Sequence, residues 1–418
     1  MKIDSQIKKL KRKIPYFLKK IHSRGQGFYH IIDDEKTVLA IQKYSRTVRG
    51  KYDDIVLLGI GGSALGATTI YQSLKHPFAN ELTSSKRKYP RLHVLDNIDP
   101  ELISGIEDII NYKRTLFIVA SKSGKTPETI SQYFYFKRKC DEKKLNSTDH
   151  FVFITEQDKG LLEKISLKEN IPVFFIPKNV GGRFSVLTPV GLLPAALTGI
   201  NIQSLIFGAK KMRENFLSRS FEKNIPYKIA ASQFLLYKKG INITVLYPYS
   251  QRLVKFTDWY KQLLAESIGK AKNNKGKKVH VGITPVNALG VTDQHSQNQL
   301  YNEGPNDKFF IFIKVKNLGE TIRIPNLYPR DEDTNYIKNL SFNKLFHTEQ
   351  EGTIQALTHY KRPNIIINID EVDEENLGAL FMLFESSTAF LGELFEINAF
   401  NQPGVELSKK ITKTLLLK

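Results

Sequence analysis

Two short turns in the sequence carry residue types that hold a phosphate group. The segment "SKSGKTPET" follows the apolar run "TLFIVA" and supplies hydroxyls at Ser121, Ser123 and Thr126, with Lys122 in the same turn. Pro127 is typical of the first turn of a helix. Hydroxyls and the free amides of a helix start suit a phosphate dianion, each bond to a charged group contributing roughly 1.5–3 kcal/mol. A capped helix start without a ligand is the alternative.

The other turn, "GIGGSALG" at 59–66, also follows an apolar run. Gly61 and Gly62 allow positive φ and a close approach of the backbone to a ligand, and Ser63 adds a hydroxyl. The spacing also fits the dinucleotide pattern G-x-G-x-x-A, and a tight turn without a ligand remains possible. We interpret both turns as holding one phosphate. "SKSGKTPET" does not complete a nucleotide-binding P-loop, because Val119 stands where the first glycine of that pattern belongs.

Two charged residues further along could act on the group that carries the phosphate. Arg183 lies beside two glycines in "GGRFS", and its guanidinium forks toward anionic oxygens. Glu266 shares one face of an amphipathic segment, 256–270, with Trp259 and Leu263. Burial on that face would raise the pKa of the carboxyl group and suit it to act as a base. A structural arginine and a solvent-exposed glutamate are the alternatives.

Three more residues stay in view with weaker support. His295 lies among amides and acids in "VTDQHSQNQLYNEGPND", where Glu303 is a second candidate carboxylate. Lys409 falls on a helical segment after the turn that contains Gln402. A lone histidine is more often structural, and a lysine on a terminal helix usually faces solvent.

These residues need a scaffold, and alternating apolar runs supply one. Continuous apolar segments separated by helical patterns predict a parallel sheet covered on both faces. The first set of predicted strands is followed by a second set, which includes "ITVLYP", "VHVGIT", "FFIFIKV" and "NIIINI". We therefore expect an α/β fold with two doubly wound parallel-sheet domains and helical extensions at both ends. The predicted segments are a helical stretch over 1–45, domains over 46–215 and 216–395, and a helical tail over 396–418. In such sheets, ligands lie at the carboxyl ends of strands, where both turns fall.

Composition limits the class of protein. The chain has 418 residues with a net charge of +20, and its basic residues are spread along the sequence. We attribute the charge to a lysine-rich proteome together with attraction for an anionic substrate. We expect no nucleic-acid partner, because no zinc-ligand spacing or RNA-binding signature is present. The single cysteine, Cys140, suits a reducing compartment. No secretory signal or apolar run of about 18 residues is evident, so we expect a cytoplasmic protein without a membrane partner.

The order of these motifs resembles that of the glucose-6-phosphate isomerase family, also called the phosphoglucose isomerase family, and most resembles its short bacterial members. "GGRFS" matches one family signature, and 398–409 matches the long C-terminal one. "GIGGSALG", "SKSGKTPET" and "AESIGK" match three further family blocks, and the likeness extends from about residue 50 to the C-terminus.

The resemblance implies two sugar-isomerase (SIS) domains in a homodimer, with the active site at the subunit interface and no metal or cofactor. It implies that the protein interconverts D-glucose 6-phosphate and D-fructose 6-phosphate through a cis-enediolate. Glu266 would be the base, with Glu303 as the alternative, and Arg183 would face the enediolate. His295 and Lys409 would open the sugar ring. The implied substrate-binding residues are Gly61, Gly62, Ser63, Ser121, Lys122, Ser123, Thr126 and Gln402.

Two rival functions predict different behaviour. A non-catalytic SIS-type sensor of phosphosugars needs the two phosphate turns but not Glu266, His295 or Lys409. A nucleic-acid-binding protein would show affinity that falls steeply with salt.

Overall fold

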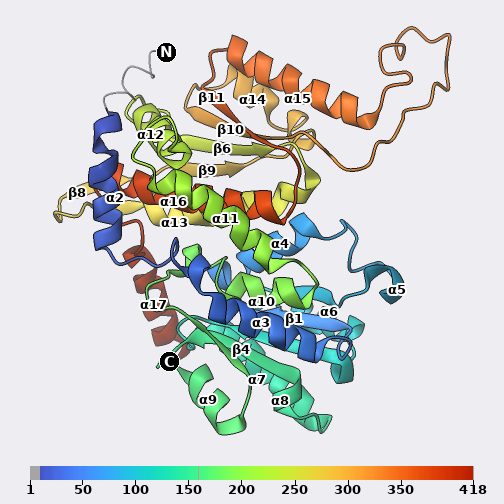
Figure 1. Cartoon of the computed structure of the whole chain (residues 1–418), viewed down its shortest axis with the longest axis vertical. Coiled ribbons are helices and arrows are strands. Elements are labelled where there is room, and N and C mark those ends of the chain that lie inside the picture. The colour runs from blue at the N-terminus through green and yellow to red at the C-terminus, as the bar shows by residue number, and fades with distance from the viewer. Residues whose placement is uncertain (1–9, 159, 418) are drawn as a thin grey trace.

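The computed structural model describes residues 10–158 and 160–417, and it contains two parallel sheets with helices packed around them (Figure 1). The first sheet has the strand order β2-β1-β3-β4-β5, and every pairing in it is parallel. Its strands are β1 (Asp54–Leu58), β2 (Arg91–Leu95), β3 (Thr115–Ala120), β4 (Phe151–Glu156) and β5 (Val173–Ile176). The chain passes from β1 to β2 on one side and then returns to β3 on the other. The crevice of this sheet therefore opens between the ends of β1 and β3.

Both faces of the first sheet are buried, which explains its continuous apolar strands. Ile55 and Leu57 belong to one hydrophobic cluster, whereas Val56 and Leu58 belong to another on the opposite face. The first cluster includes residues of α3 (Glu35–Val48) and α10 (Pro189–Leu197). The second includes residues of α6 (Pro100–Ile109) and α7 (Pro127–Glu142). Alternating side chains can all be apolar only when helices cover both sides of the sheet.

The second sheet has the order β11-β10-β6-β9, again all parallel. Its strands are β6 (Ile243–Pro248), β9 (Thr284–Asn287), β10 (Lys308–Val315) and β11 (Asn364–Ile369). One predicted strand is wrong: most of "VHVGIT" is not in this sheet. Lys278–Val281 form β8, which pairs antiparallel with β7 (Lys270–Lys272) in a separate hairpin. Gly282 follows β8, and the side chain of His280 is exposed, so this run lacks the two buried faces of an internal strand.

A long apolar helix, α16 (Glu374–Leu394), lies among the helices between the two sheets (Figure 1). By length and composition it could cross a membrane, but 94% of its apolar window is buried inside the protein, as in the core helix of a soluble protein. It packs against α11 (Ile202–Leu217), α12 (Ile225–Tyr237) and α13 (Val254–Ile268). Because α16 contacts α13, the core fixes the helix that carries Glu266.

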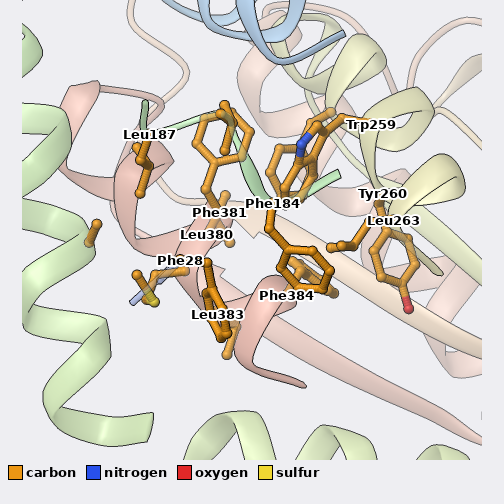
Figure 2. Packing of buried hydrophobic residues seen from close by; sticks show 14 of the residues in the cluster. Phe28, Phe184, Leu187, Trp259, Tyr260, Leu263, Leu380, Phe381, Leu383 and Phe384 are labelled. Carbon is orange, nitrogen blue, oxygen red and sulfur yellow. The ribbon is translucent and has the colours of Figure 1, made fainter. Parts of the chain in front are cut away.

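The aromatic core beside α13 is visible in Figure 2. The rings of Trp259 and Phe381 lie 4.7 Å apart at 76°, and those of Tyr260 and Phe384 lie 4.6 Å apart at 57°. Phe184, next to Arg183, belongs to the same core. The first pair is edge-on and the second is tilted, and aromatic pairs of this kind add about 0.5–1.5 kcal/mol beyond area burial. The helix of Glu266 and the turn of Arg183 are therefore held by one packed core.

The remaining helices cover the sheet faces and the chain ends. They are α2 (Ile14–Ser23), α4 (Leu65–Leu74), α5 (Ser84–Arg87), α8 (Ser147–His150), α9 (Leu161–Glu169), α14 (Asn298–Glu303), α15 (Phe342–His359) and α17 (Glu406–Leu416).

The predicted domain boundaries at 45/46 and 215/216 fall inside α3 and α11, and the division into domains stays a prediction. The predicted α/β class with two parallel sheets is confirmed.

Candidate functional site

The glycine turn leaves β1 and doubles back tightly before α4. A Cβ on Gly59 would lie 2.8 Å from the carbonyl oxygen of Ser63 and 3.3 Å from that of Ala120, so only glycine fits there. Gly61 has a φ of +58°, and Gly61–Ser63 form the short 3-10 helix η3. Ser63 is half-buried at the end of that helix. The turn thus leaves backbone amides and one hydroxyl at the carboxyl edge of the sheet.

The hydroxyl turn leaves β3, the strand next to β1. Ser121 Oγ lies 2.8 Å from Thr126 Oγ1, and Ser123 Oγ lies 3.5 Å from the same atom, so the three predicted hydroxyls are together. Thr126 is the N-cap residue of α7, yet its side chain accepts no bond from the helix amides. The amides at the start of this 16-residue helix therefore have no side-chain cap, which favours an anion over the simple capping role.

The two turns are neighbours in space. Leu58 and Val119 are paired in the register of β1 and β3, and Gly59 approaches Ala120 closely. Both turns therefore meet at the point where the strand order reverses, which is where ligands bind in doubly wound sheets.

The side chain of Lys122 does not join the hydroxyl cluster formed by its neighbours in the turn. Its ammonium donates to the carbonyl oxygens of Lys178, at 2.9 Å, and Val180, at 2.7 Å, and lies 3.5 Å from a Glu156 carboxylate oxygen. These bonds tie the hydroxyl turn to the segment that leads into Gly181. The structure thus shows Lys122 as a positioning residue, and its predicted contact with substrate stays a prediction.

Arg183 is the centre of the second half of the site. Its side chain is only 4% exposed, and burial lowers the pKa of its guanidinium, while the Glu266 carboxylate opposes that shift. It donates to five acceptors on two other segments: Ser267 Oγ (3.0 Å), Glu266 Oε2 (2.9 Å), Gln402 Oε1 (2.9 Å), and the carbonyl oxygens of Ala399 (2.9 Å) and Asn401 (3.4 Å). A guanidinium bonded in this way is fixed in position before any ligand arrives.

The glycine turn packs directly on the Arg183 turn. A Cβ on Gly62 would lie 2.3 Å from the carbonyl oxygen of Gly182. Ser185 Oγ donates to the same oxygen at 2.7 Å and approaches the Gly62 carbonyl oxygen at 3.4 Å. Backbone contact between Gly62 and Gly182 therefore joins the glycine turn to the turn of the buried arginine.

Glu266 lies in the last turn of α13, at the edge of its apolar face. Glu266 lies between the two alternatives of burial and exposure: 34% of its side chain is exposed, whereas Trp259 and Leu263 on the same face are buried. Both carboxylate oxygens have partners. Oε2 accepts from Arg183, and Oε1 accepts from Gln262 Nε2 at 2.9 Å. The carboxylate is thus oriented yet accessible, as a base that meets a ligand must be.

Two residues of this cluster were missed by sequence reasoning. Gln262 is four residues before Glu266 on the same helix, and that spacing could have found it. Lys270 is buried and donates to the carbonyl oxygens of Glu266 (2.6 Å) and Ser267 (2.8 Å), where a cation stabilises the end of α13. Burial and the nearby Arg183 charge lower the pKa of Lys270 to about 8, against the opposing pull of Glu266.

Three predicted residues lie outside this cluster. His295 is exposed at the end of a short 3-10 helix, and Lys409 on α17 pairs with Glu406 at 3.0 Å. Glu303 is exposed and accepts from Gln299 at 2.7 Å. In the described part of the chain, no hydrogen bond or ion pair joins any of the three to Arg183 or Glu266. The geometry therefore favours Glu266 over Glu303 as the base.

Comparisons with known proteins cover most of the chain. A family model described as phosphoglucose isomerase matches residues 38–418. A glucose-6-phosphate isomerase of Carboxydothermus hydrogenoformans is 43% identical over 395 residues, covering 93% of this chain and 84% of the relative. A probable glucose-6-phosphate isomerase of Methanococcus maripaludis is 37% identical over 97% of this chain and 87% of its own length.

Two solved structures are similar to this chain along most of its length. A hypothetical protein from Thermus thermophilus has a TM-score of 0.90 at 32% identity, covering all of this chain and 97% of its own. A glucose-6-phosphate isomerase from Chlamydia trachomatis, at 23% identity, has a TM-score of 0.78 over 91% of this chain and 73% of its own, and shows the shared fold. The predicted fold class of two SIS-type sheets is confirmed by these neighbours.

Proposed function

The chain belongs to the phosphoglucose isomerase family and interconverts D-glucose 6-phosphate and D-fructose 6-phosphate, and we propose that Glu266 carries the proton through a cis-enediolate. One observation carries this mechanism: an oriented, accessible carboxylate lies 2.9 Å from a buried guanidinium, beside two turns that present hydroxyls and free helix amides.

The two turns hold the sugar phosphate in this proposal. Ser121, Ser123 and Thr126 supply hydroxyls from one turn, while Ser63 and the amides of Gly61 and Gly62 supply the other. The positive ends of α4 and α7 add to the attraction for the dianion. The phosphate takes no part in bond breaking, so its binding energy serves to place C1 and C2 of the sugar.

Glu266 removes the proton from C2 of the open-chain aldose, and the electron pair becomes the C1=C2 bond of the enediolate. The carbonyl electron pair moves onto O1, and the proton on O2 then passes to O1. The same carboxyl group returns its proton to C1 as the C2=O bond of the ketose forms. Arg183 stabilises the charge that develops on the enediolate oxygens, with no reorganisation because its contacts already fix it. General-base action of this kind typically accounts for about 10²–10⁴-fold in rate. The proposal needs neither a metal nor a cofactor.

The proposal includes a homodimer in which His295 and Lys409 reach the site of the other subunit and open the sugar ring. Both side chains are exposed and lack a bond to the Arg183 cluster. In addition, none of the residues of α17 is buried, although Leu407, Ile411 and Leu415 are large and apolar. An exposed apolar helix face of this kind is typical of an interface.

A mixed-dimer experiment tests the shared site. Glu266→Gln and His295→Asn subunits are mixed, unfolded and refolded together. If each site uses Glu266 of one subunit and His295 of the other, half of the mixed dimers' sites are intact, so about a quarter of wild-type activity returns. No recovery of activity above that of the separate variants would show that one subunit supplies both residues.

Turnover of the purified protein tests the function as a whole. Wild-type protein should convert fructose 6-phosphate to glucose 6-phosphate, whereas Glu266→Gln should lose turnover and keep sugar-phosphate binding. Glu303→Gln is the matched control, because Glu303 bonds only to the neighbouring Gln299. A phosphosugar sensor without catalysis would bind ligand and show no turnover in any of the three.

We also propose a cytoplasmic location and no membrane or nucleic-acid partner. Cys140 is buried with a free thiol, and burial raises its pKa to about 12, so it is an inert thiol that suits a reducing compartment. Among residues 10–158 and 160–417, the one helix apolar enough to span a membrane is a buried core helix.

A further inference from the structure

A cavity lies at the edge of the first sheet where β1 and β3 begin, opposite the edge that carries the glycine and hydroxyl turns. Its volume is about 330 Å³, and its walls include the end of α3, the segment 84–90 and the segment 196–201. The five residues of β1 separate it from the glycine turn, a span of roughly 16 Å at the rise of a parallel strand. The cavity is therefore distinct from the site of Arg183 and Glu266.

The cavity has a large excess of positive charge. Five cationic side chains line it, and the only carboxylate in its lining belongs to Asp53. Arg114 already neutralises that carboxylate through two bonds of 2.5 and 2.9 Å. Arg87 donates to two backbone carbonyl oxygens, at 2.6 and 2.7 Å.

The other three cations, Arg46, Arg49 and Lys88, form no ion pair with a carboxylate in the described part of the chain, and all three are exposed. Arg46 and Arg49 belong to the end of α3, Lys88 belongs to the segment 84–90, and both segments line the cavity. Like charges held together without a counter-ion repel one another, so an anion between them would relieve that repulsion.

The wall formed by Tyr89 is already in place. A Cβ on Gly199 would lie 2.4 Å from the Tyr89 ring, and Gly199 has a φ of +80°, so the glycine lets the ring lie flat on the backbone. The Arg49 guanidinium lies 5.4 Å from the ring centroid, and the Lys75 ammonium lies 4.9 Å from it. The cation–π interaction holds the Arg49 guanidinium against the Tyr89 ring, and both residues line the cavity.

We propose that this cavity binds a small anion that carries two or more phosphate groups. Its volume falls within the range of small-molecule sites. Three unpaired cations on separate segments match several linked phosphates better than a single one, and guanidinium groups bind phosphate oxygens in a bidentate way. A nucleoside triphosphate and an inorganic polyphosphate share this chemistry.

Isothermal titration calorimetry with inorganic tripolyphosphate, ATP and orthophosphate tests the proposal. Fructose 6-phosphate is present at saturation so that the catalytic site is filled, and each titration is repeated without it. The variant Arg46→Gln/Arg49→Gln removes two unpaired cations, and Lys88→Gln removes the third from a different segment. Lys43→Gln is the matched control, since Lys43 is exposed on α3 and does not line the cavity.

We expect one equivalent of tripolyphosphate to bind wild type and Lys43→Gln alike, and orthophosphate to bind far more weakly. The dissociation constant should rise at least about tenfold in each cavity variant, because a charged hydrogen bond is lost. Tighter binding of ATP than of tripolyphosphate would identify a nucleoside polyphosphate as the ligand, and equal binding would identify the phosphate chain alone. Absence of binding to wild type, or cavity variants that keep wild-type affinity, would overturn the proposal.

Discussion

Replacement of Gly62 by alanine should separate the glycine turn from the Arg183 turn. A Cβ on Gly62 would lie 2.3 Å from the Gly182 carbonyl oxygen, 2.6 Å from its carbonyl carbon and 3.2 Å from the Arg183 backbone nitrogen. All three are backbone atoms, so no change of rotamer relieves the overlap. One turn must move away from the other.

The size of the effect follows from these distances. Non-bonded heavy atoms settle at about 3.5–4.0 Å, so the turns must separate by about 1 Å. Overpacking of this kind costs about 1–3 kcal/mol of folding free energy. A displacement of about 1 Å at a catalytic group costs about 10²-fold in rate. We therefore expect kcat/KM of Gly62→Ala to fall about 100-fold, with a lowered Tm.

The assay is conversion of fructose 6-phosphate, coupled to oxidation of the glucose 6-phosphate formed, together with thermal unfolding. Gly182→Ala and Gly105→Ala are matched controls, because a Cβ at either position meets no atom within 4 Å. Gly105 lies inside α6, so its alanine variant should gain about 0.5–1 kcal/mol in stability. A Gly62→Ala protein within threefold of wild-type kcat/KM would refute the reasoning.

Three further substitutions test the surroundings of the pair. Arg183→Lys cannot reproduce the forked contacts to Glu266, Gln402 and the backbone. In steady-state assays kcat should therefore fall by about 10²-fold or more. A kcat near that of wild type would contradict the role of the guanidinium. Lys122→Met removes the two bonds from the Lys122 ammonium to the 178–180 segment, so KM for fructose 6-phosphate should rise. An unchanged KM would argue against a role of Lys122 in positioning that segment. Because the pKa of Lys270 is lowered from 10.5 to about 8, the unfolded chain binds more protons than the folded protein between these values. The unfolding free energy of wild type relative to Lys270→Met should therefore rise from pH 8 to pH 10 in urea titrations, and a constant difference would contradict the lowered pKa.

The strands of the first sheet could be predicted because each contains a short run of mostly apolar residues. Runs such as 54–58 and 115–120 need cover on both faces, and two clusters supply it. The hairpin of β7 and β8 could not be predicted, because the alternation in "VHVGIT" does not specify which strand pairs with it. Pairing depends on contacts distant in sequence, and single-sequence patterns do not contain them.

The types of the site residues could be predicted, but not their mutual contacts. Glycines and hydroxyls after apolar strands indicated two turns that could hold a phosphate, and the strand order places these turns side by side. Their binding of phosphate stays a prediction. Gln262 and Lys270 bond to Glu266 over a spacing of four residues, which the sequence contains, whereas the bond from Arg183 to Glu266 depends on the packing that places the end of α13 beside the Arg183 turn. The partial exposure of Glu266 has the same origin, since it lies in the last turn of that helix.

Proton exchange at the sugar carbon tests the central claim most directly. Fructose 6-phosphate is incubated in D₂O with each protein, and deuterium at C1 is followed by NMR. If Glu266 carries the proton, wild type incorporates deuterium at C1 of fructose 6-phosphate and Glu266→Gln does so at least about 10²-fold more slowly. Exchange by Glu266→Gln at the wild-type rate would show that another group is the base.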